Sequence, residues 1–321
     1  MLKYKLKQFA MKYSVMIVMI LLIILFSFTS RSFLTLKNII NLITQNTFYI
    51  ICSVGMAFVM IGGGVDLSVG YQMSLVGVIV AILMTEYNWP VLLAVIVGLV
   101  VGSLLGIING IIVTRLNLFP LIVTLAMSTV YQGISFIITQ AKTYRSFPDS
   151  FRLICTGTFL GINYDVYLAF VIVLISEFVL RKTYFGRYIY ATGGNSDAAY
   201  LSGIKVNKIK VFLYGLCGFL FAIATIDMIA KANSTSSSFG PGTEFVGMTA
   251  ALIGGISFKG GKGSMLGLVA GVFVLQILGN GMQLAGWGTY LQYIVKGVIL
   301  IIAIAMDGIM VKNQSNKPLK A

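Results

Sequence analysis

Long apolar runs separated by short polar segments set the pattern of this 321-residue chain. A helix needs about 20 apolar residues to cross the hydrocarbon core of a bilayer, and ten runs approach or exceed that length. We expect one spanning helix from each of residues 13–30, 39–61, 70–85, 90–113, 118–140, 164–180, 211–230, 243–258, 264–285 and 289–306. The pattern predicts an all-α, polytopic membrane protein with about ten transmembrane helices.

The composition supports this interpretation. Apolar residues make up 58% of the chain and charged residues only 10%, whereas a soluble domain carries about 25% charged residues. The polar surface is too small to face water on all sides, so we interpret residues 1–321 as a single transmembrane domain. The three cysteines, Cys52, Cys155 and Cys217, have neither metal-site spacing nor the pattern of a disulfide framework.

The distribution of positive charge predicts the orientation. Ten spans place both ends of the chain on one side, where sixteen of the 23 Lys and Arg residues then fall, against six on the other. Since basic loops stay in the cytoplasm, we expect cytoplasmic N- and C-termini. A cytoplasmic head (residues 1–12), loop (181–210) and tail (307–321) follow. This topology explains the net charge of +14 without nucleic acid as a partner.

A glycine-rich segment interrupts the apolar pattern at residues 61–70, IGGGVDLSVG. Three consecutive glycines disfavour a continuous helix, and Asp66 is expensive at membrane depth. We expect a break on the cytoplasmic side, with Asp66 or Ser68 capping the helix that follows. The segment is either a simple boundary between spans or part of a pore or gate. The candidate residues are Gly63, Gly64, Asp66, Leu67, Ser68 and Gly70.

A second polar segment, residues 191–204, reads ATGGNSDAAYLSGI. Asn195 or Ser196 is a good helix start, Asp197 suits the first turn, and Ser202 with Gly203 suits the end. A helix this short is not stable alone and needs a partner surface. The alternative is a solvated loop.

Two further glycine patterns concern packing and nucleotide binding. Glycines recur every four residues at 98, 102 and 106 and again at 263, 267 and 271, which indicates either permanent close helix packing or sliding contacts. Residues 252–267, LIGGISFKGGKGSMLG, do not match the phosphate-binding loop, because Ile256 stands where its first glycine is required. The chain therefore cannot hydrolyse nucleotide by that route.

Taken together, IGGGVDLSVG, ATGGNSDAAYLSGIKV, ALIGGISFKGGKGS and YLQYIVKGVILIIAIAMD resemble the ribose-type sugar permease family of ATP-binding-cassette importers, in order and spacing, over nearly the whole chain. The resemblance implies a non-enzymatic permease of the bacterial inner membrane that pairs with a second permease chain. It also implies an extracytoplasmic sugar-binding protein and a cytoplasmic ATPase that holds ATP and Mg, so this chain needs no cofactor. The ATPase would dock on Ala191, Gly194, Asn195, Ala198, Ala199, Ser202, Gly203 and Ile204.

Neutral amides in or near the spans are the candidates for the solute path, because sugar hydroxyls need hydrogen-bonding partners rather than charges. They are Gln45, Asn46, Asn109, Gln132, Asn280 and Gln283. Each could instead form an interhelical hydrogen bond. The alternative solutes are a branched-chain amino acid, a nucleoside or a furanosyl signal molecule. Other classes are an ion-coupled secondary transporter, for which we see no clear inverted repeat, and a structural scaffold.

Overall fold

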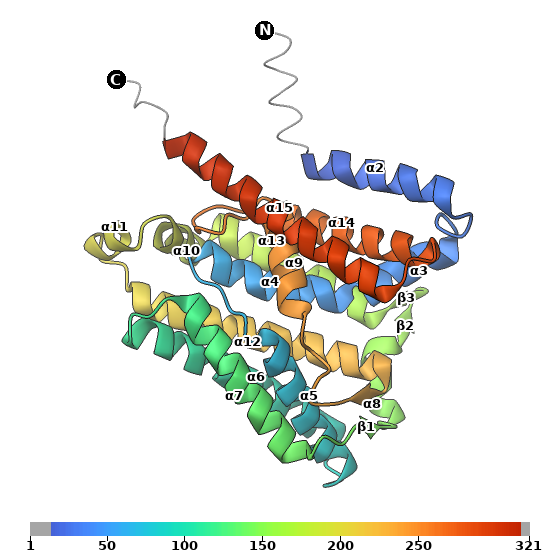
Figure 1. The fold of residues 1–321 in the computed structure, drawn as a ribbon. Coiled ribbons are helices and arrows are strands. Elements are labelled where there is room, and N and C mark those ends of the chain that lie inside the picture. The colour runs from blue at the N-terminus through green and yellow to red at the C-terminus, as the bar shows by residue number, and fades with distance from the viewer. Residues whose placement is uncertain (1–13, 316–321) are drawn as a thin grey trace.

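The computed structural model describes residues 14–315, and nearly every predicted span forms a helix within about five residues of its predicted ends (Figure 1). The predicted head, residues 1–12, and the end of the tail lie outside the described residues. The long helices are α2 (Ser14–Thr29), α3 (Leu36–Gln45), α4 (Thr47–Ile61), α5 (Val69–Thr85), α6 (Val91–Arg115), α7 (Pro120–Thr139), α9 (Tyr164–Lys182), α12 (Val206–Ala232), α13 (Thr243–Ile253), α14 (Met265–Leu284) and α15 (Thr289–Ser315).

Helix α4 is the centre of the bundle. It packs against α9, α12, α13 and α14, and its side chains are buried from Ile50 to Ile61. An apolar helix buried all round belongs to the interior of a larger assembly of helices. The predicted span 39–61 is broken in two at Asn46, which is both the C-cap of α3 and the N-cap of α4.

Close glycine contacts join α6 to α12. A β-carbon on Gly102 would lie 2.7 Å from the carbonyl oxygen of Gly218, and one on Gly106 would overlap the carbonyl oxygen of Tyr214. Backbones can approach this closely only where side chains are absent. The glycine repeat of α6 therefore lies at a close helix–helix contact, as both permanent packing and a sliding contact require.

The second glycine repeat is only partly helical. Gly267 and Gly271 of α14 face the backbone of Gly254 and Ala250 at the end of α13. Gly263 precedes the helix, with φ of 146°, so its inclusion in the repeat was wrong. Helix α13 is also shorter than the predicted span 243–258, because the chain turns at Gly254 and Gly255.

The two ends of the bundle carry different small elements (Figure 1). At one end, β1 (Tyr144–Arg145) pairs antiparallel with β4 (Ser234–Thr235), and β2 (Thr158–Phe159) pairs with β3 (Ile162–Asn163) beside α8 (Asp149–Thr156). The other end carries α10 (Tyr184–Gly194) and α11 (Ser196–Leu201). We call these the strand end and the α11 end.

The protein is built from membrane-spanning helices. Within residues 14–315, six helical segments are long and apolar enough to cross a bilayer. They are Leu36–Ile61, which combines α3 and α4, Val91–Arg115, Pro120–Thr139, Val206–Ala232, Met265–Leu284 and Thr289–Ile309. Helices α2, α5 and α13 are apolar but shorter. Helix α9 carries Asp165, Glu177, Arg181 and Lys182, which lower its hydropathy.

Candidate functional site

The short helix predicted at the α11 end forms as expected. Its N-cap is Asn195, whose side-chain oxygen accepts a hydrogen bond from the Ala198 N–H at 2.9 Å. Gly203 follows the helix with φ of 85°, a left-handed conformation that favours glycine. The side chains of Tyr200 and Leu201 are 71% and 85% exposed. Helix α11 therefore presents two large apolar groups that nothing in the described chain covers.

The segment 181–210, predicted as a loop between two spans, contains more helix than the single short one expected. Most of the segment is helical. It contains α10 and α11, and α12 already begins at Val206. Thr183 caps α10, since its hydroxyl accepts a hydrogen bond from the Gly186 N–H at 3.1 Å. Ile189 and Thr192 of α10 are buried three residues apart. The Thr183 cap and this spacing were a usable signal for α10 in the sequence.

Three glycine segments meet at the C-terminal end of α10. Gly193 lies against Ile61, the last residue of α4, and the Gly261 N–H donates to the Ile61 carbonyl at 2.8 Å. A β-carbon on Gly260 would lie 2.8 Å from the Cα of Gly63. We call these contacts among residues 61–64, 193–194 and 260–261 the glycine junction. It joins the helix that carries α11 directly to the break between α4 and α5.

Polar contacts hold the loop that supplies Gly260 and Gly261. The Tyr190 hydroxyl of α10 donates to the Gly263 carbonyl at 2.8 Å, and burial raises the pKa of Tyr190, which keeps the phenol protonated. Glu177 accepts from the Met265 N–H at 2.8 Å, and Asp307 accepts from the Phe258 N–H at 2.9 Å. Sequence reasoning missed these three side chains, because nothing in the sequence pairs them with a distant loop.

The predicted break between α4 and α5 is present, and Asp66 lies fully buried within it. Its carboxylate accepts hydrogen bonds from the Ser68 N–H at 3.0 Å and the Ser68 hydroxyl at 2.6 Å. The amides of Asn109 and Gln72 donate to it at 3.2 Å and 3.3 Å. The expected side-chain cap was wrong in detail, because Ser68 makes no capping hydrogen bond and Asp66 instead holds the Ser68 backbone.

Other hydrogen bonds fix the break to the surrounding helices. The Tyr214 hydroxyl of α12 donates to the Val65 carbonyl at 3.0 Å, and the Leu67 N–H donates to the Thr124 hydroxyl of α7 at 3.1 Å. Gly70 packs so closely on Glu244 that a β-carbon would overlap its carboxylate. The candidate gate motif therefore contacts α7, α12 and α13 at once.

A cavity lined by apolar side chains and several amides lies nearer the strand end, between α3, α4, α12, α13, α14 and α15. It consists of two compartments of about 480 Å³ and 490 Å³. Both are lined by Tyr49, Met228, Phe239, Gln276 and Lys296. The amides in the walls are Gln45, Asn46, Gln276, Asn280, Gln283 and Gln292. Amides and aromatic faces together suit a neutral, hydroxyl-rich solute.

The structure brings four of the six predicted amides into this cavity and places two elsewhere. Gln45, Asn46, Asn280 and Gln283 line it. Asn109 instead belongs to the buried Asp66 network. Gln132 lies on α7, outside the lining of the cavity.

Asn280 and Lys296 also line the cavity, and the structure gives each a different environment. Asn280 and Asn38 exchange hydrogen bonds at 2.9 Å and 3.0 Å, so Asn280 also serves the packing of α14 on α3. Lys296 of α15 lines both compartments, and within residues 14–315 it has no ion-pair partner. Sequence reasoning placed Lys296 inside the last span without assigning it a role.

The other lysine, Lys231, belongs to a buried charge cluster at the cavity edge. Its ammonium group contacts Asp165 of α9, Asp227 of α12 at 2.9 Å and the Thr47 hydroxyl of α4 at 2.5 Å. Both carboxylates are buried. The cluster links α4, α9 and α12 to one another at the strand end of the bundle.

These features are those expected of a membrane-embedded helical transport subunit, with an amide-containing cavity between its helices and an exposed short helix at one end. The chain belongs to the family described as the permease component of branched-chain amino acid transport systems, which matches residues 38–304. This assignment makes it a transport component, and the prediction that it is not an enzyme is confirmed.

Curated relatives cover nearly its full length. The chain is 35% identical to the Ribose import permease protein RbsC of Escherichia coli (strain K12) over 95% of this chain and 96% of the relative. It is 38% identical to RbsC of Bacillus subtilis (strain 168), over 89% of both chains. It is 32% identical to the D-allose transport system permease protein AlsC of E. coli (strain K12), over 94% and 93%. No solved structure matches the chain significantly.

Proposed function

We propose that this chain is the permease subunit of an ATP-binding-cassette importer for a monosaccharide of the ribose type. Full-length similarity to ribose import permeases, at 35% and 38% identity, is the observation that carries the proposal. Relatives named for allose and galactose transport support the sugar class as well. The family description names branched-chain amino acids, but the full-length relatives above are named for sugars.

Ten spans with both termini in the cytoplasm fit the order of elements. On this topology α2, α3 with α4, α5, α6, α7, α9, α12, α13, α14 and α15 cross in alternating directions. The α11 end then faces the cytoplasm, where the excess of Lys and Arg supports the orientation. The membrane is the bacterial inner or plasma membrane.

The partner ATPase docks on α11 and the residues around it. Exposed Tyr200 and Leu201 offer an apolar contact that the described chain leaves uncovered. The predicted docking set is Ala191, Gly194, Asn195, Ala198, Ala199, Ser202, Gly203 and Ile204. A displacement of α11 and α10 by the ATPase reaches the end of α4 through the glycine junction, because no side chains lie between the backbones.

The glycine junction passes this displacement to the break between α4 and α5. Residues Gly63, Gly64, Asp66, Leu67, Ser68 and Gly70 form the gate motif, and Gly70 contacts Glu244 at the start of α13. Helix α13 in turn contributes Thr243, Val246 and Thr249 to the cavity wall. The gate motif therefore lies between the docking helix and the cavity, where closure and opening of the path must be controlled.

Two further partners complete the transporter. An extracytoplasmic sugar-binding protein delivers the solute at the strand end, and a second permease chain completes the path. Helix α15 lines the cavity, but no residue in the most apolar stretch of Thr289–Ile309 is buried by the described chain. That surface of α15 is therefore available to the second permease chain.

Uptake by reconstituted vesicles tests the proposed function. The permease and its ATPase are reconstituted in vesicles with ATP either present or absent inside. The binding protein is added outside, together with labelled ribose or labelled leucine. ATP-dependent accumulation of the sugar supports the proposal. Uptake of leucine alone, or accumulation by the permease alone with only an ion gradient, contradicts it.

A further inference from the structure

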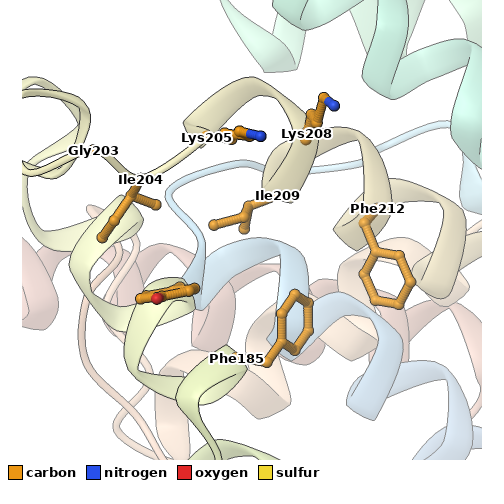
Figure 2. Close-up of a pocket in the computed structure, with 8 residues that line it drawn as sticks. Phe185, Gly203, Ile204, Lys205, Lys208, Ile209 and Phe212 are labelled. Carbon is orange, nitrogen blue, oxygen red and sulfur yellow. The ribbon is translucent and has the colours of Figure 1, made fainter.

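A forked groove with a basic rim lies on the side of the bundle near the α11 end, away from the solute cavity. Its first arm, about 420 Å³, lies between α10 and the start of α12, where Figure 2 shows its labelled lining residues. Its second arm, about 550 Å³, lies between α6 and α12. Lys208 and Phe212 line both arms, so the two arms meet at these side chains.

The inside of the groove is apolar and partly aromatic. Phe185 of α10 and Phe212 of α12 pack edge to face, with ring centroids 5.1 Å apart. The remaining apolar lining comes from Ile204 and Ile209 in the first arm and from Ile107, Ile111 and Val211 in the second. Phe212 is 54% exposed. Apolar surface of this kind is stable at the membrane-facing side of a transmembrane bundle, where lipid chains cover it.

The rim of the groove is cationic and has no acidic residue in its lining. Lys205 and Lys208 line the first arm, and Lys208 and Arg115 line the second. Among the ion pairs of residues 14–315, none involves these three side chains. All three side chains are exposed, so an anion from outside the described chain can reach them.

The order of these groups along α12 matches the order of groups in a phospholipid. Lys208 and Phe212 are four residues apart and lie on the same face of the helix. Lys208 is one turn nearer the α11 end than Phe212, and Arg115 ends α6 at the same level of the bundle. A headgroup phosphate at Lys208 thus leaves the two acyl chains to enter the two arms on either side of Phe212.

We propose that this forked groove is a binding site for an anionic phospholipid of the cytoplasmic leaflet. The proposal uses the orientation argued above, in which the α11 end faces the cytoplasm, and it does not depend on the solute. Basic pockets between transmembrane helices on that side bind anionic headgroups by direct charge attraction. The first arm lies between α10 and α12 and shares Gly203 and Ile204 with the predicted docking set, so a bound lipid also braces the edge of the docking surface.

Lipid binding by the purified full chain tests the proposal. Fluorescent phosphatidylglycerol and fluorescent phosphatidylcholine are titrated into detergent-solubilised protein, and unlabelled inorganic phosphate is added as a competitor. The wild-type protein binds phosphatidylglycerol more tightly. The double variant Lys205→Gln, Lys208→Gln weakens that binding roughly 30-fold, as expected for the loss of two surface cations, and leaves phosphatidylcholine binding unchanged.

Two further variants make the result specific. Lys182→Gln with Lys259→Gln removes two exposed lysines at the same end that do not line the groove, and it retains wild-type binding. Phe212→Ala weakens the binding of both lipids, because it removes the wall shared by the two arms. Size-exclusion profiles and helical circular dichroism establish that each variant is folded.

Three results would overturn the proposal. The first is equal affinity of the wild type and the Lys205, Lys208 double variant for phosphatidylglycerol. The second is displacement of the lipid by inorganic phosphate at low millimolar concentration, which would identify a free-anion site. The third is unchanged lipid binding with lost ATPase co-purification in the double variant, which would assign the groove to the protein partner. Sugar uptake by the reconstituted transporter is measured separately, so failure of the lipid site and failure of the proposed function are distinguishable.

Discussion

Gly193 packs against the carbonyl of Ile61 with no room for a side chain, because a β-carbon there would overlap that oxygen. Two elements more than 130 residues apart in sequence thus touch backbone to backbone, at the point where α4 ends and α10 supports α11. A rigid contact of this kind transmits displacement with little loss, since no flexible side chain absorbs it.

The first prediction concerns this contact. Gly193→Ala forces the two backbones apart, at a cost of about 1–3 kcal/mol, and we expect ATP-driven uptake to fall at least tenfold. Gly133→Ala on α7 is the control, because its β-carbon meets nothing within 4 Å and it lies outside the glycine junction and the docking set. Uptake and thermal unfolding are measured for both variants. Equal uptake by the two would remove the glycine junction from the mechanism.

The cap of α11 gives a second prediction. Asn195→Ala removes the acceptor of the Ala198 N–H, which destabilises the helix by about 1 kcal/mol. Asn195→Ser keeps a capping hydroxyl. Co-purification of the ATPase with the permease should drop in the first variant and recover in the second. If both variants retain the ATPase equally, α11 is not the docking element or its order does not matter.

A more severe change at the same helix tests docking directly. Gly203 has φ of 85° and open space around it, so Gly203→Arg adds both backbone strain and bulk beside α11. We expect normal membrane insertion with loss of ATPase co-purification and of uptake. Deletion of residues 195–199 should behave in the same way. Wild-type co-purification by either variant contradicts the docking surface.

The Asp66 network gives a prediction about stability. Asp66→Ala leaves the amides of Asn109 and Gln72 buried with fewer partners, and each unpaired group costs about 1–3 kcal/mol. We expect a lower midpoint of thermal unfolding together with reduced uptake. The control is Asp149→Ala, whose side chain is 90% exposed. A gate role predicts that uptake falls further than the amount of folded protein, whereas a purely structural role predicts an equal fall.

The solute cavity gives a prediction about affinity. Gln276 lines both compartments, and Gln276→Ala removes hydrogen-bonding groups from the wall. We expect the KM for the sugar to rise about tenfold, equivalent to ~1.4 kcal/mol, with ATPase docking intact. Gln132→Ala is the matched control on α7, outside the cavity. A larger effect at Gln132 than at Gln276 would place the solute path elsewhere.

Local sequence patterns predicted most of the helices and the small helix α11. Apolar run lengths gave the spans, and the Asn195 cap with Gly203 gave the ends of α11, because these signals act over a few residues. The break at Asn46 was missed although residues 44–47 read TQNT, because these four polar residues lie within a segment long enough to be read as one span. Helix α10 was missed, because its charge and its glycines suggested a loop.

The candidate site was harder to predict, because it depends on contacts between distant segments. The three glycine motifs were each recognised, but nothing in the sequence says that residues 61–64, 193–194 and 260–261 meet. Residue type alone also could not separate Asn109, which serves the Asp66 network, from Gln45, which lines the cavity. That distinction depends on which face of each helix packs inward.

Helix α15 supplies Tyr293 and Lys296 to the cavity, although no residue in its most apolar stretch is buried by the rest of the described chain. One wall of the solute chamber is therefore held in place mainly from outside, by whatever surrounds the subunit. Extraction into detergent removes that support. A solubilised single subunit should thus retain its docking helix and its interior while losing affinity for its cargo, and the native bilayer becomes part of the binding site.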